Sequence, residues 1–295
     1  MKPAPFEYVS PPILSTALDL LAENAFEAKL LAGGQSLVPA MNFRLTQPTM
    51  LIDLNRLSEL DYVRSNGDNI VHIGALTRHR TLERDPLIRK RIPLLNETMP
   101  LIAHSQIRNR GTIGGSLAHA DPAAELPAIL VALQGRVRLK NRVQERWVLA
   151  TNFFKSIFTT DLEPDEILVE VELPTISKGQ GWSFLEFSRR KGDYALMGVA
   201  ALLSIDSHGF CQGSRLVYIN SGDVPLVALP AMKMLDGEPP SDSLFEAAAR
   251  VASQEVINPS ANIHASVAYL RHLAYVLTRR ALNIALERTL SSMKD

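Results

Sequence analysis

Two short glycine-rich segments constrain most strongly what this chain can fold into. The first, residues 32–36 (AGGQS), follows a buried strand pattern and precedes a helical one. The second, residues 111–116 (GTIGGS), has the same paired glycines and flanking hydroxyl groups. Glycine permits positive φ and close approach of the backbone to a ligand, and successive N–H groups in such turns form a concavity that suits an anion. We therefore expect two turns that grip one diphosphate from opposite sides.

Neither segment matches a better-known nucleotide-binding motif. Residues 32–36 lack the Gly-Lys-Ser/Thr ending of a Walker A loop. They also lack the third glycine of the Rossmann fingerprint, and Asp53 stands only loosely where that fingerprint needs an acid. Taken alone, an ordinary turn with two glycines explains the first segment, so the prediction depends on the pair.

Charged residues surround the second segment. Asp121 is a candidate to accept hydrogen bonds from ribose or ribityl hydroxyls, which requires a fixed carboxylate and no proton transfer. It also begins the run Asp-Pro-Ala-Ala-Glu, a good helix start with Asp121 as N-cap, and both roles can hold together. Arg108 and Arg110 either neutralise phosphate or face solvent or a neighbouring subunit. We interpret His104 and His119 as structural or solvent-facing.

The pattern of hydrophobic residues predicts an α+β chain with a break after Pro174. The part before the break contains a small α/β unit over the first ~55 residues, a hairpin at Asn66-Gly67, a buried helix at 124–133 and a half-buried strand at 167–173. Residues 178–181 are the best linker candidate. Beyond them we expect strands at 182–189, 195–206 and 209–219, then helices at 228–236, 242–255 and 264–290. The apolar seam of the last helix should pack on its own sheet, with a subunit contact as the alternative.

The composition excludes several classes of protein. The chain has 295 residues, 46% hydrophobic and 21% charged, as in an ordinary globular protein of two domains. Its 31 basic residues balance 31 acidic ones, which argues against a nucleic-acid binder. The single cysteine, Cys211, cannot hold an iron–sulfur cluster or form an intrachain disulfide. We find no secretory signal and no apolar run long enough to span a bilayer, and therefore expect a soluble, cytoplasmic protein without a transmembrane segment.

Three ordered motifs carry a resemblance to a known family. They are AGGQS at 32–36, QIRNRGTIGGSLAHADPAAELPA at 106–128 and RRKGDYALMGVA at 189–200. Together they resemble the FAD-binding (medium) subunit of molybdenum hydroxylases, similar to the carbon monoxide dehydrogenase medium subunit and the xanthine dehydrogenase flavin domain. The resemblance covers essentially the whole chain. It implies a two-part FAD-binding domain of the vanillyl-alcohol-oxidase/PCMH type over residues 1–176, with subdomains of about 1–57 and 58–176, and a C-terminal domain of the carbon monoxide dehydrogenase flavoprotein type over 177–295.

The resemblance also implies cofactor-binding roles for individual residues, and no catalytic or metal-binding ones. Both glycine-rich segments would wrap the FAD diphosphate, Asp121 would bind flavin-side hydroxyls, and the backbone of Leu168 would contact the flavin or adenine side. Tyr194, from the C-terminal domain, would lie close to the isoalloxazine ring. The full set is Ala32, Gly33, Gly34, Gln35, Ser36, Thr112, Gly114, Gly115, Ser116, Asp121, Leu168 and Tyr194.

The function implied by the resemblance is electron transfer within a larger complex. A large subunit would hold a molybdenum–pterin cofactor, a small subunit two [2Fe–2S] clusters, and this chain FAD, from which electrons leave to an external acceptor. A dimer of heterotrimers is expected. Carbon monoxide, aldehydes, purines and N-heteroaromatics are all oxidised by complexes with similar flavin subunits. The alternatives are a self-sufficient FAD-dependent oxidase or reductase with its own substrate pocket, and a scaffold that has lost FAD. The residues after 180 show no obvious catalytic cluster, and the intact glycine segments argue against the scaffold.

Overall fold

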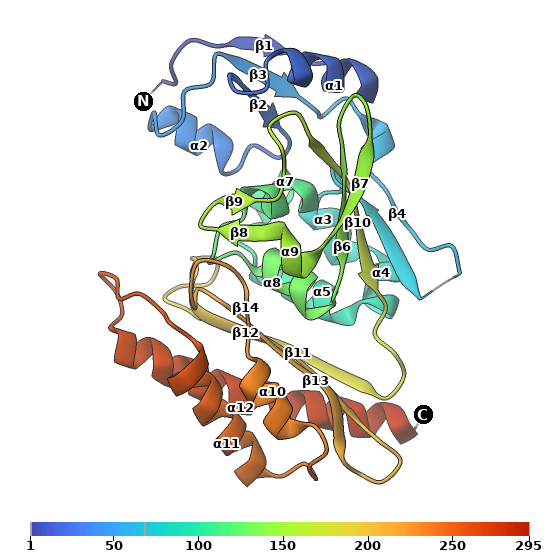
Figure 1. Cartoon of the computed structure of the whole chain (residues 1–295), viewed down its shortest axis with the longest axis vertical. Helices are drawn as coiled ribbons and strands as arrows, with labels where there is room; N and C mark the ends of the chain where they lie inside the picture. The colour runs from blue at the N-terminus through green and yellow to red at the C-terminus, as the bar shows by residue number, and fades with distance from the viewer. Residues whose placement is uncertain (1, 68, 295) are drawn as a thin grey trace.

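The computed structural model describes residues 2–67 and 69–294, and it has three parts stacked along the long axis (Figure 1). The N-terminal part is a small α/β unit, the middle part is a sheet covered by helices, and the C-terminal part is a second sheet backed by long helices. Among the described residues, no helix is both long and apolar enough to cross a bilayer.

The N-terminal part is built on three parallel strands in the order β1-β3-β2. Ala17, Leu18 and Leu21 of the flanking helix α1 are buried against this sheet, because they recur at helical spacing on one face. Parallel strands end at the same edge, so the segments after β2 and after β3 lie side by side. The elements are β1 (Glu7–Val9), α1 (Leu14–Glu23), β2 (Ala28–Leu31), α2 (Leu37–Asn42) and β3 (Met50–Asp53).

The middle part contains a five-stranded antiparallel sheet in the order β4-β5-β10-β6-β7. Short helices cover one face and form the largest core with it. The sheet comprises β4 (Val63–Arg64), β5 (Ile70–Gly74), β6 (Arg136–Lys140), β7 (Glu145–Leu149) and β10 (Ile167–Pro174). The helices are α3 (His79–Arg84), α4 (Pro86–Arg91), α5 (Pro93–Thr98), α6 (Ser105–Arg108), α7 (Ile113–His119), α8 (Glu125–Ala132) and α9 (Ala150–Phe153), with 3-10 turns at Ser58–Leu60 and Met99–Leu101 and a small β8 (Phe154–Ser156)–β9 (Thr159–Thr160) hairpin.

The C-terminal part is a four-stranded antiparallel sheet with helices on one face. Its other face packs on α5 and α8 of the middle part, so Phe184, Leu202 and Ile219 join the middle core. Leu270, Ala274 and Ala281 of the last helix are buried against the sheet, which confirms the predicted use of that seam. The elements are β11 (Gln180–Ser188), β12 (Ala195–Ile205), β13 (Cys211–Ile219), β14 (Leu226–Val227), α10 (Leu229–Leu235), α11 (Asp242–Val251), a π-helical turn (Ala252–Val256) and α12 (Val267–Lys294).

Two local predictions differ from the structure. Strands β4 and β5 pair on either side of Asn66-Gly67, Val63 with Ile73 and Arg64 with His72, in a register that differs from that of a two-residue turn at these positions. Strand β10 is buried on both faces and not half buried. Its glutamates Glu170 and Glu172 are covered because arginines of β6 pair with them.

Candidate functional site

The first glycine-rich segment is an open turn with unused hydrogen-bond donors. Gly34 has a φ of 73°, in the left-handed region that glycine accepts without strain. Within the described part of the chain, the backbone N–H groups of residues 33–36 donate to no acceptor. Ser36 precedes α2, yet its hydroxyl does not cap that helix. The turn therefore presents free donors, as an anion-binding concavity requires.

The second segment is not the turn that the sequence predicts. Helix α7 begins at Ile113, so Gly114 and Gly115 lie in its first turn. Gly114 N–H donates to the Ala75 carbonyl (2.9 Å), and Gly115 N–H donates to the capping hydroxyl of Thr112 (3.1 Å). A Cβ on Gly114 would lie 2.6 Å from the Cβ of Ala75. Glycine is needed here for close packing of helix against sheet, and most of the donors are already used.

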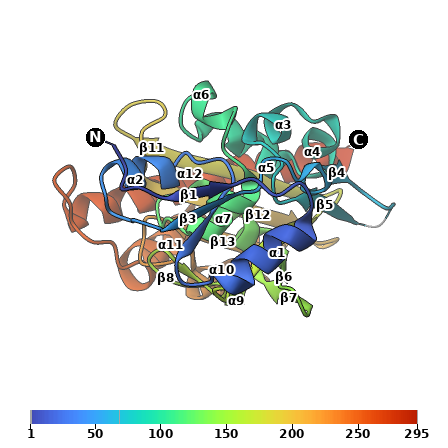
Figure 2. The ribbon, with the colours of Figure 1, turned by 90° about the horizontal axis from the view of Figure 1, so that it is seen from above.

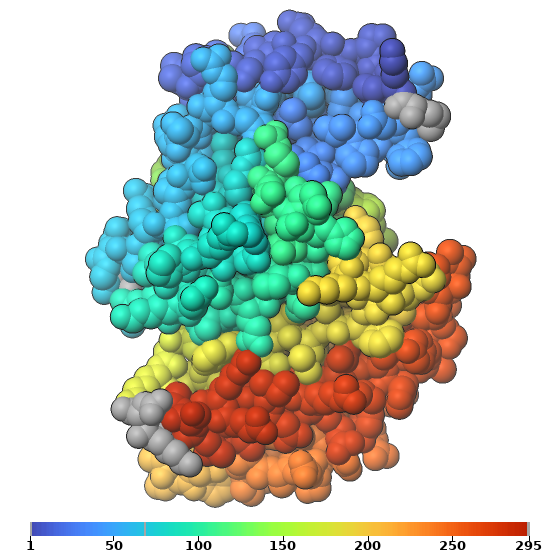
Figure 3. All heavy atoms as spheres, turned by 180° about the vertical axis from the view of Figure 1, so that it is seen from behind, coloured from blue at the N-terminus to red at the C-terminus, as the bar shows by residue number. Residues whose placement is uncertain are grey.

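The two segments nevertheless meet. A Cβ added to Gly33 would lie 2.6 Å from the carbonyl oxygen of Arg110 and 2.7 Å from the Cα of Gly111. A Cβ on Gly115 would lie 3.5 Å from the Cβ of Ala32. Figures 1 and 2 show α7 directly under the N-terminal sheet. From behind, a notch opens between the blue N-terminal lobe and the yellow segment near residue 190 (Figure 3).

His79 holds the second segment through hydrogen bonds to two of its carbonyl groups. It is 5% exposed, its N–H donates to the Gly111 carbonyl (2.9 Å), and its Nε2 donates to the Thr112 carbonyl (3.0 Å). Burial lowers the pKa of His79 to about 4, with smaller contributions from the charges of Arg108 and Arg78, so the ring is neutral at pH 7. No local pattern around His79 predicts this role.

Tyr194 belongs to a loop of the C-terminal sheet that packs against His104, shortly before the second segment in the chain. The ring is 70% exposed and lies directly before β12. Gly192 in the same loop has a φ of 86°, and a Cβ there would lie 2.6 Å from Nδ1 of His104. Desolvation, then the charges of Asp121 and Glu125, raise the pKa of Tyr194, so the ring lies near these acids.

Asp121 forms a tight turn instead of capping a helix. Its Oδ1 accepts from the Ala123 N–H (2.9 Å), whereas Ala124 is the N-cap residue of α8, which corrects the predicted capping role. Asn220 fixes this turn to the Tyr194 loop, because its N–H donates to the Pro122 carbonyl (2.8 Å) and its Nδ2 to the Ala195 carbonyl (3.0 Å). The turn and the loop are thereby held as one unit.

The comparisons decide the family. The model for the FAD binding domain in molybdopterin dehydrogenase matches residues 4–176, and that for the CO dehydrogenase flavoprotein C-terminal domain matches 182–285. The chain belongs to the family of FAD-binding medium subunits of molybdenum hydroxylases. It is 41% identical to the 6-hydroxypseudooxynicotine dehydrogenase complex subunit alpha of Paenarthrobacter nicotinovorans, covering 98% of this chain and 97% of that one. It is 36% identical to the carbon monoxide dehydrogenase medium chain of Hydrogenophaga pseudoflava, covering 98% and 99%.

Solved structures agree with the family. A carbon monoxide dehydrogenase structure from Hydrogenophaga pseudoflava superimposes with a TM-score of 0.94 at 37% identity, covering 98% of this chain and 99% of that one. Quinoline 2-oxidoreductase from Pseudomonas putida 86 gives 0.92 at 36% identity, covering 99% and 100%. The predicted fold class, a two-part FAD-binding domain followed by an antiparallel sheet with helices, is confirmed. The relatives are subunits of oxidoreductases.

The residues present fit an FAD of this family. The free N–H groups of the first segment suit a diphosphate, and the half-exposed Gly115 lies beside Ala32 and Gly33, with the half-exposed Ser116 next along α7. Other predicted members are buried. Thr112 is 1% exposed, and its hydroxyl caps α7. Leu168 points into the core. The backbone beside it is linked to the second segment through Ala75, whose N–H donates to the Val169 carbonyl (3.1 Å) and whose carbonyl accepts from the Gly114 N–H (2.9 Å).

Other charged groups near the site have structural partners or lie at the domain boundary. Arg108 is buried, pairs with Glu83 (3.0 Å) and donates to the carbonyls of Ile102 and Ala103 (both 2.9 Å), so of the open alternatives neither a phosphate contact nor a solvent-facing side chain fits it. Glu125 of α8 and Glu186 of β11 lie between the middle and C-terminal parts. Burial raises the pKa of Glu125 to about 7, and burial with the Glu125 charge raises that of Glu186 to about 8. No sequence motif predicts that either glutamate lies at this boundary.

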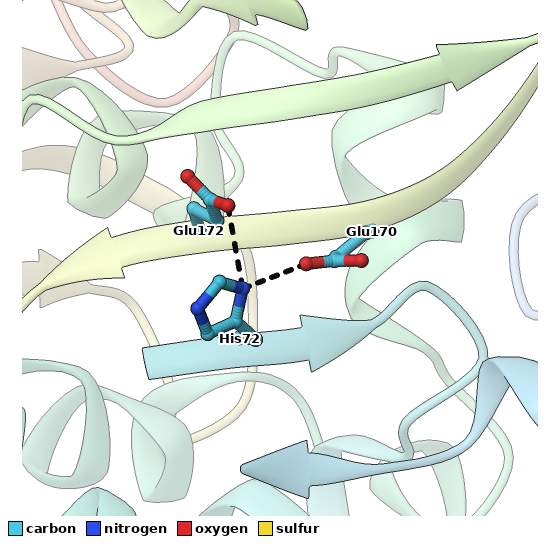
Figure 4. A group of neighbouring side chains, drawn as sticks. All are labelled: His72, Glu170 and Glu172. Carbon is cyan, nitrogen blue, oxygen red and sulfur yellow. Dashed lines mark hydrogen bonds and ion pairs between the residues drawn. The ribbon is translucent and has the colours of Figure 1, made fainter. Parts of the chain in front are cut away.

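A second cluster lies on the outer face of the middle sheet. His72 Nδ1 is 2.8 Å from Glu170 Oε1 and 3.3 Å from Glu172 Oε1 (Figure 4). These donor types could hold a metal ion. However, Arg138 pairs with Glu170 (2.5 Å), and Arg136 pairs with Glu172. We assign the cluster to an ion-pair network that lets glutamates occupy a central strand.

Proposed function

We propose that this chain is the electron-transfer subunit of its complex. In this proposal a small partner subunit with two [2Fe–2S] clusters passes electrons to the FAD held here, and an external acceptor receives them. A large partner subunit with a molybdenum–pterin cofactor hydroxylates the substrate. When bound, FAD supplies the redox chemistry, and the protein supplies binding, orientation and electrostatics. A dimer of heterotrimers in the cytoplasm stays a prediction.

The observation that carries the proposal is the junction of the two glycine-rich segments. One segment offers free N–H groups, the other closes on it at van der Waals distance, and Arg110 lies exposed beside them. We assign the diphosphate to residues 32–36 and to Thr112, Gly114, Gly115 and Ser116. Asp121 would take flavin-side hydroxyls, the Leu168 backbone would contact the cofactor, and Tyr194 would lie against the isoalloxazine ring. We also propose the domain boundary at 176/177 and the subdomain boundary near 57/58.

The alternative, a self-sufficient oxidase or reductase, makes a different prediction. Such an enzyme reduces its flavin with a small organic substrate in the absence of partner chains. An electron-transfer subunit reduces it only when the iron–sulfur and molybdenum subunits are present. Anaerobic absorbance of the FAD-loaded chain, with and without partners, separates the two. Bleaching of the flavin by substrate alone would exclude the electron-transfer proposal.

We further expect one FAD per chain, bound without a covalent link. Acid precipitation should then release the yellow colour into the supernatant. Colour that stays with the pellet would contradict the non-covalent assignment. A chain that retains no FAD under any condition, alone or in complex, would contradict the proposed function itself.

A further inference from the structure

Arg78 links the two glycine-rich segments through its side chain. Its Nη2 donates to Asn55 Oδ1 at 2.6 Å, and its Nη1 donates to the carbonyl oxygen of Arg110. Asn55 in turn donates from Nδ2 to the carbonyl oxygen of Ala32 at 2.9 Å. One guanidinium therefore reaches the residue before the first glycine pair, through Asn55, and the residue before the second segment directly.

The backbone of Arg78 is fixed to the second segment. The N–H of Ile113 donates to the Thr77 carbonyl at 3.1 Å, and the N–H of His79 donates to the Gly111 carbonyl at 2.9 Å. Arg78 itself forms an antiparallel bridge with Thr112. Its main chain thus belongs to the second segment, and only its side chain crosses to the first. Loss of the side chain would leave the second segment in place and release the link.

The junction brings two guanidinium groups together, those of Arg78 and Arg110, with the carboxylate of Asp53 near both. Neither Arg78 nor Arg110 forms an ion pair with an acid of the described chain. The charges of Asp61 and Asp53 favour the charged form of Arg78, but burial and the like charge of Arg110 lower its pKa. Two guanidinium groups that repel each other beside free N–H donors are stabilised by an anion placed between them.

We propose that Arg78 is a positioning residue that sets the spacing of the two segments for a diphosphate, and so makes the site select FAD and ADP over ligands with one phosphate. The inference rests on the proposed function, because it takes the diphosphate of FAD to lie between the segments. The planar fork of arginine suits the task, since one group must donate in two directions at once. Lysine keeps the charge but cannot span both acceptors in the same fixed geometry.

The test uses the full chain and three ligands: FAD, ADP and AMP. Arg78→Gln should weaken the binding of FAD and of ADP by about tenfold to a hundredfold, as expected for the loss of a charge-assisted hydrogen-bonded group. The affinity for AMP, measured by competition, should change far less. Arg78→Lys should lie between, because it restores the charge without the fork. Asn55→Ala should also weaken the binding of FAD and ADP. The double variant Arg78→Gln/Asn55→Ala should bind both ligands no more weakly than Arg78→Gln alone. Arg89→Gln, at an exposed end of α4, is the matched control and should have no effect.

Several outcomes would overturn the inference. Unchanged FAD affinity in Arg78→Gln would overturn it. Equal losses of affinity for ADP and for AMP would also overturn it, because they indicate general damage to the site. If Arg78→Gln does not fold, Arg78→Lys and Asn55→Ala decide, and unchanged ADP affinity in both refutes the positioning role. A wild-type chain that binds FAD while the variants bind equally well refutes this inference alone and leaves the proposed function standing.

Discussion

The two glycine-rich segments look alike in sequence and differ in structure. Residues 32–36 form an open turn whose N–H groups are free and whose Gly34 needs a positive φ. Residues 111–116 run into helix α7, and the N–H groups of residues 113–115 are already bonded to neighbouring groups. The first segment leaves its donors available for the proposed ligand, whereas the second packs closely on Ala75 and presents a rigid wall to the first.

The comparison shows that the same residue type can be required for opposite reasons. Gly34 is required by backbone conformation, because an L-residue at this φ is strained. Gly114 is required by space, because the Ala75 backbone and side chain occupy the position of a Cβ. A substitution at Gly114 should therefore lower mainly the stability of the fold, whereas one at Gly34 should lower mainly the affinity for FAD.

The largest effect is expected for Gly114→Val. The new side chain would overlap Ala75, both at its Cβ (2.6 Å) and at its carbonyl oxygen (2.7 Å), and neither can move without shifting β5 and α7. We expect a loss of about 3 kcal/mol or more in the free energy of unfolding, at the upper end for overpacked cores. Urea unfolding of the FAD-free chain measures it. An unchanged midpoint would show that α7 can move away from the sheet, and would contradict the view of a rigid wall.

His79 gives the second segment a pH dependence that the first lacks. Its folded pKa of about 4 lies below the ordinary value of 6.5, so the unfolded chain binds the proton more readily. Stability from this group is complete above pH 6.5, is lost as pH falls toward 4, and amounts to about 3 kcal/mol over that window.

The measurement compares the free energy of unfolding of wild type and His79→Gln between pH 4 and 7. Glutamine should flatten the pH dependence, although it lowers stability at pH 7 because the bond to the Thr112 carbonyl is disturbed. Glu246→Gln, which removes only a half-exposed ion pair with Arg279, is the control and should run parallel to wild type. If the free energy of unfolding of His79→Gln also runs parallel to that of wild type across this pH range, the ring is not held neutral.

Much of this architecture can be predicted from the sequence because it depends on local pattern. The seam of α12 follows from helical spacing of its apolar residues, and the C-terminal strands follow from apolar runs between turns. The turn predicted for the second segment is wrong, because paired glycines usually interrupt a helix and here lie within one. Thr112 as N-cap, with Ile113 and Leu117 buried four residues apart, was the available signal for a helix start.

The rest could not be predicted because it depends on contacts between distant residues. Asn55 and Arg78 meet only because the edge of the first sheet faces the second segment, which no local spacing shows. Strand β10 was predicted half buried because its glutamates alternate with apolar residues. Nothing in that run indicates that Arg136 and Arg138, from a neighbouring strand, cover them.

Gly34→Val tests the open segment and should give a smaller loss of stability than Gly114→Val. A side chain at φ 73° costs about 1–2 kcal/mol, and it would also lie 3.0 Å from Leu31 and 3.3 Å from Val38. FAD affinity should fall strongly, because the N–H groups of the turn must reorient. Gly209→Val is a matched control, with a φ of 89° and no neighbour within 4 Å. It should lose similar stability and keep its FAD. Equal FAD affinity in both variants would mean that the open turn does not bind the cofactor.

The smallest effect is expected for Ser36→Ala. The Ser36 hydroxyl does not cap α2, so its removal should leave the stability of the FAD-free chain unchanged. If the hydroxyl donates to the diphosphate, the variant loses one hydrogen bond of about 0.5–1.5 kcal/mol, which is roughly a two- to tenfold weaker affinity for FAD. Ser241→Ala gives the reverse case, because that hydroxyl accepts from the Leu244 N–H at 3.2 Å and caps α11. It should lower stability by about 1 kcal/mol and leave FAD affinity unchanged. Titration of FAD into each variant, beside thermal unfolding without FAD, separates the two residues. A Ser36→Ala variant that binds FAD like wild type would limit the first segment's role to its backbone N–H groups.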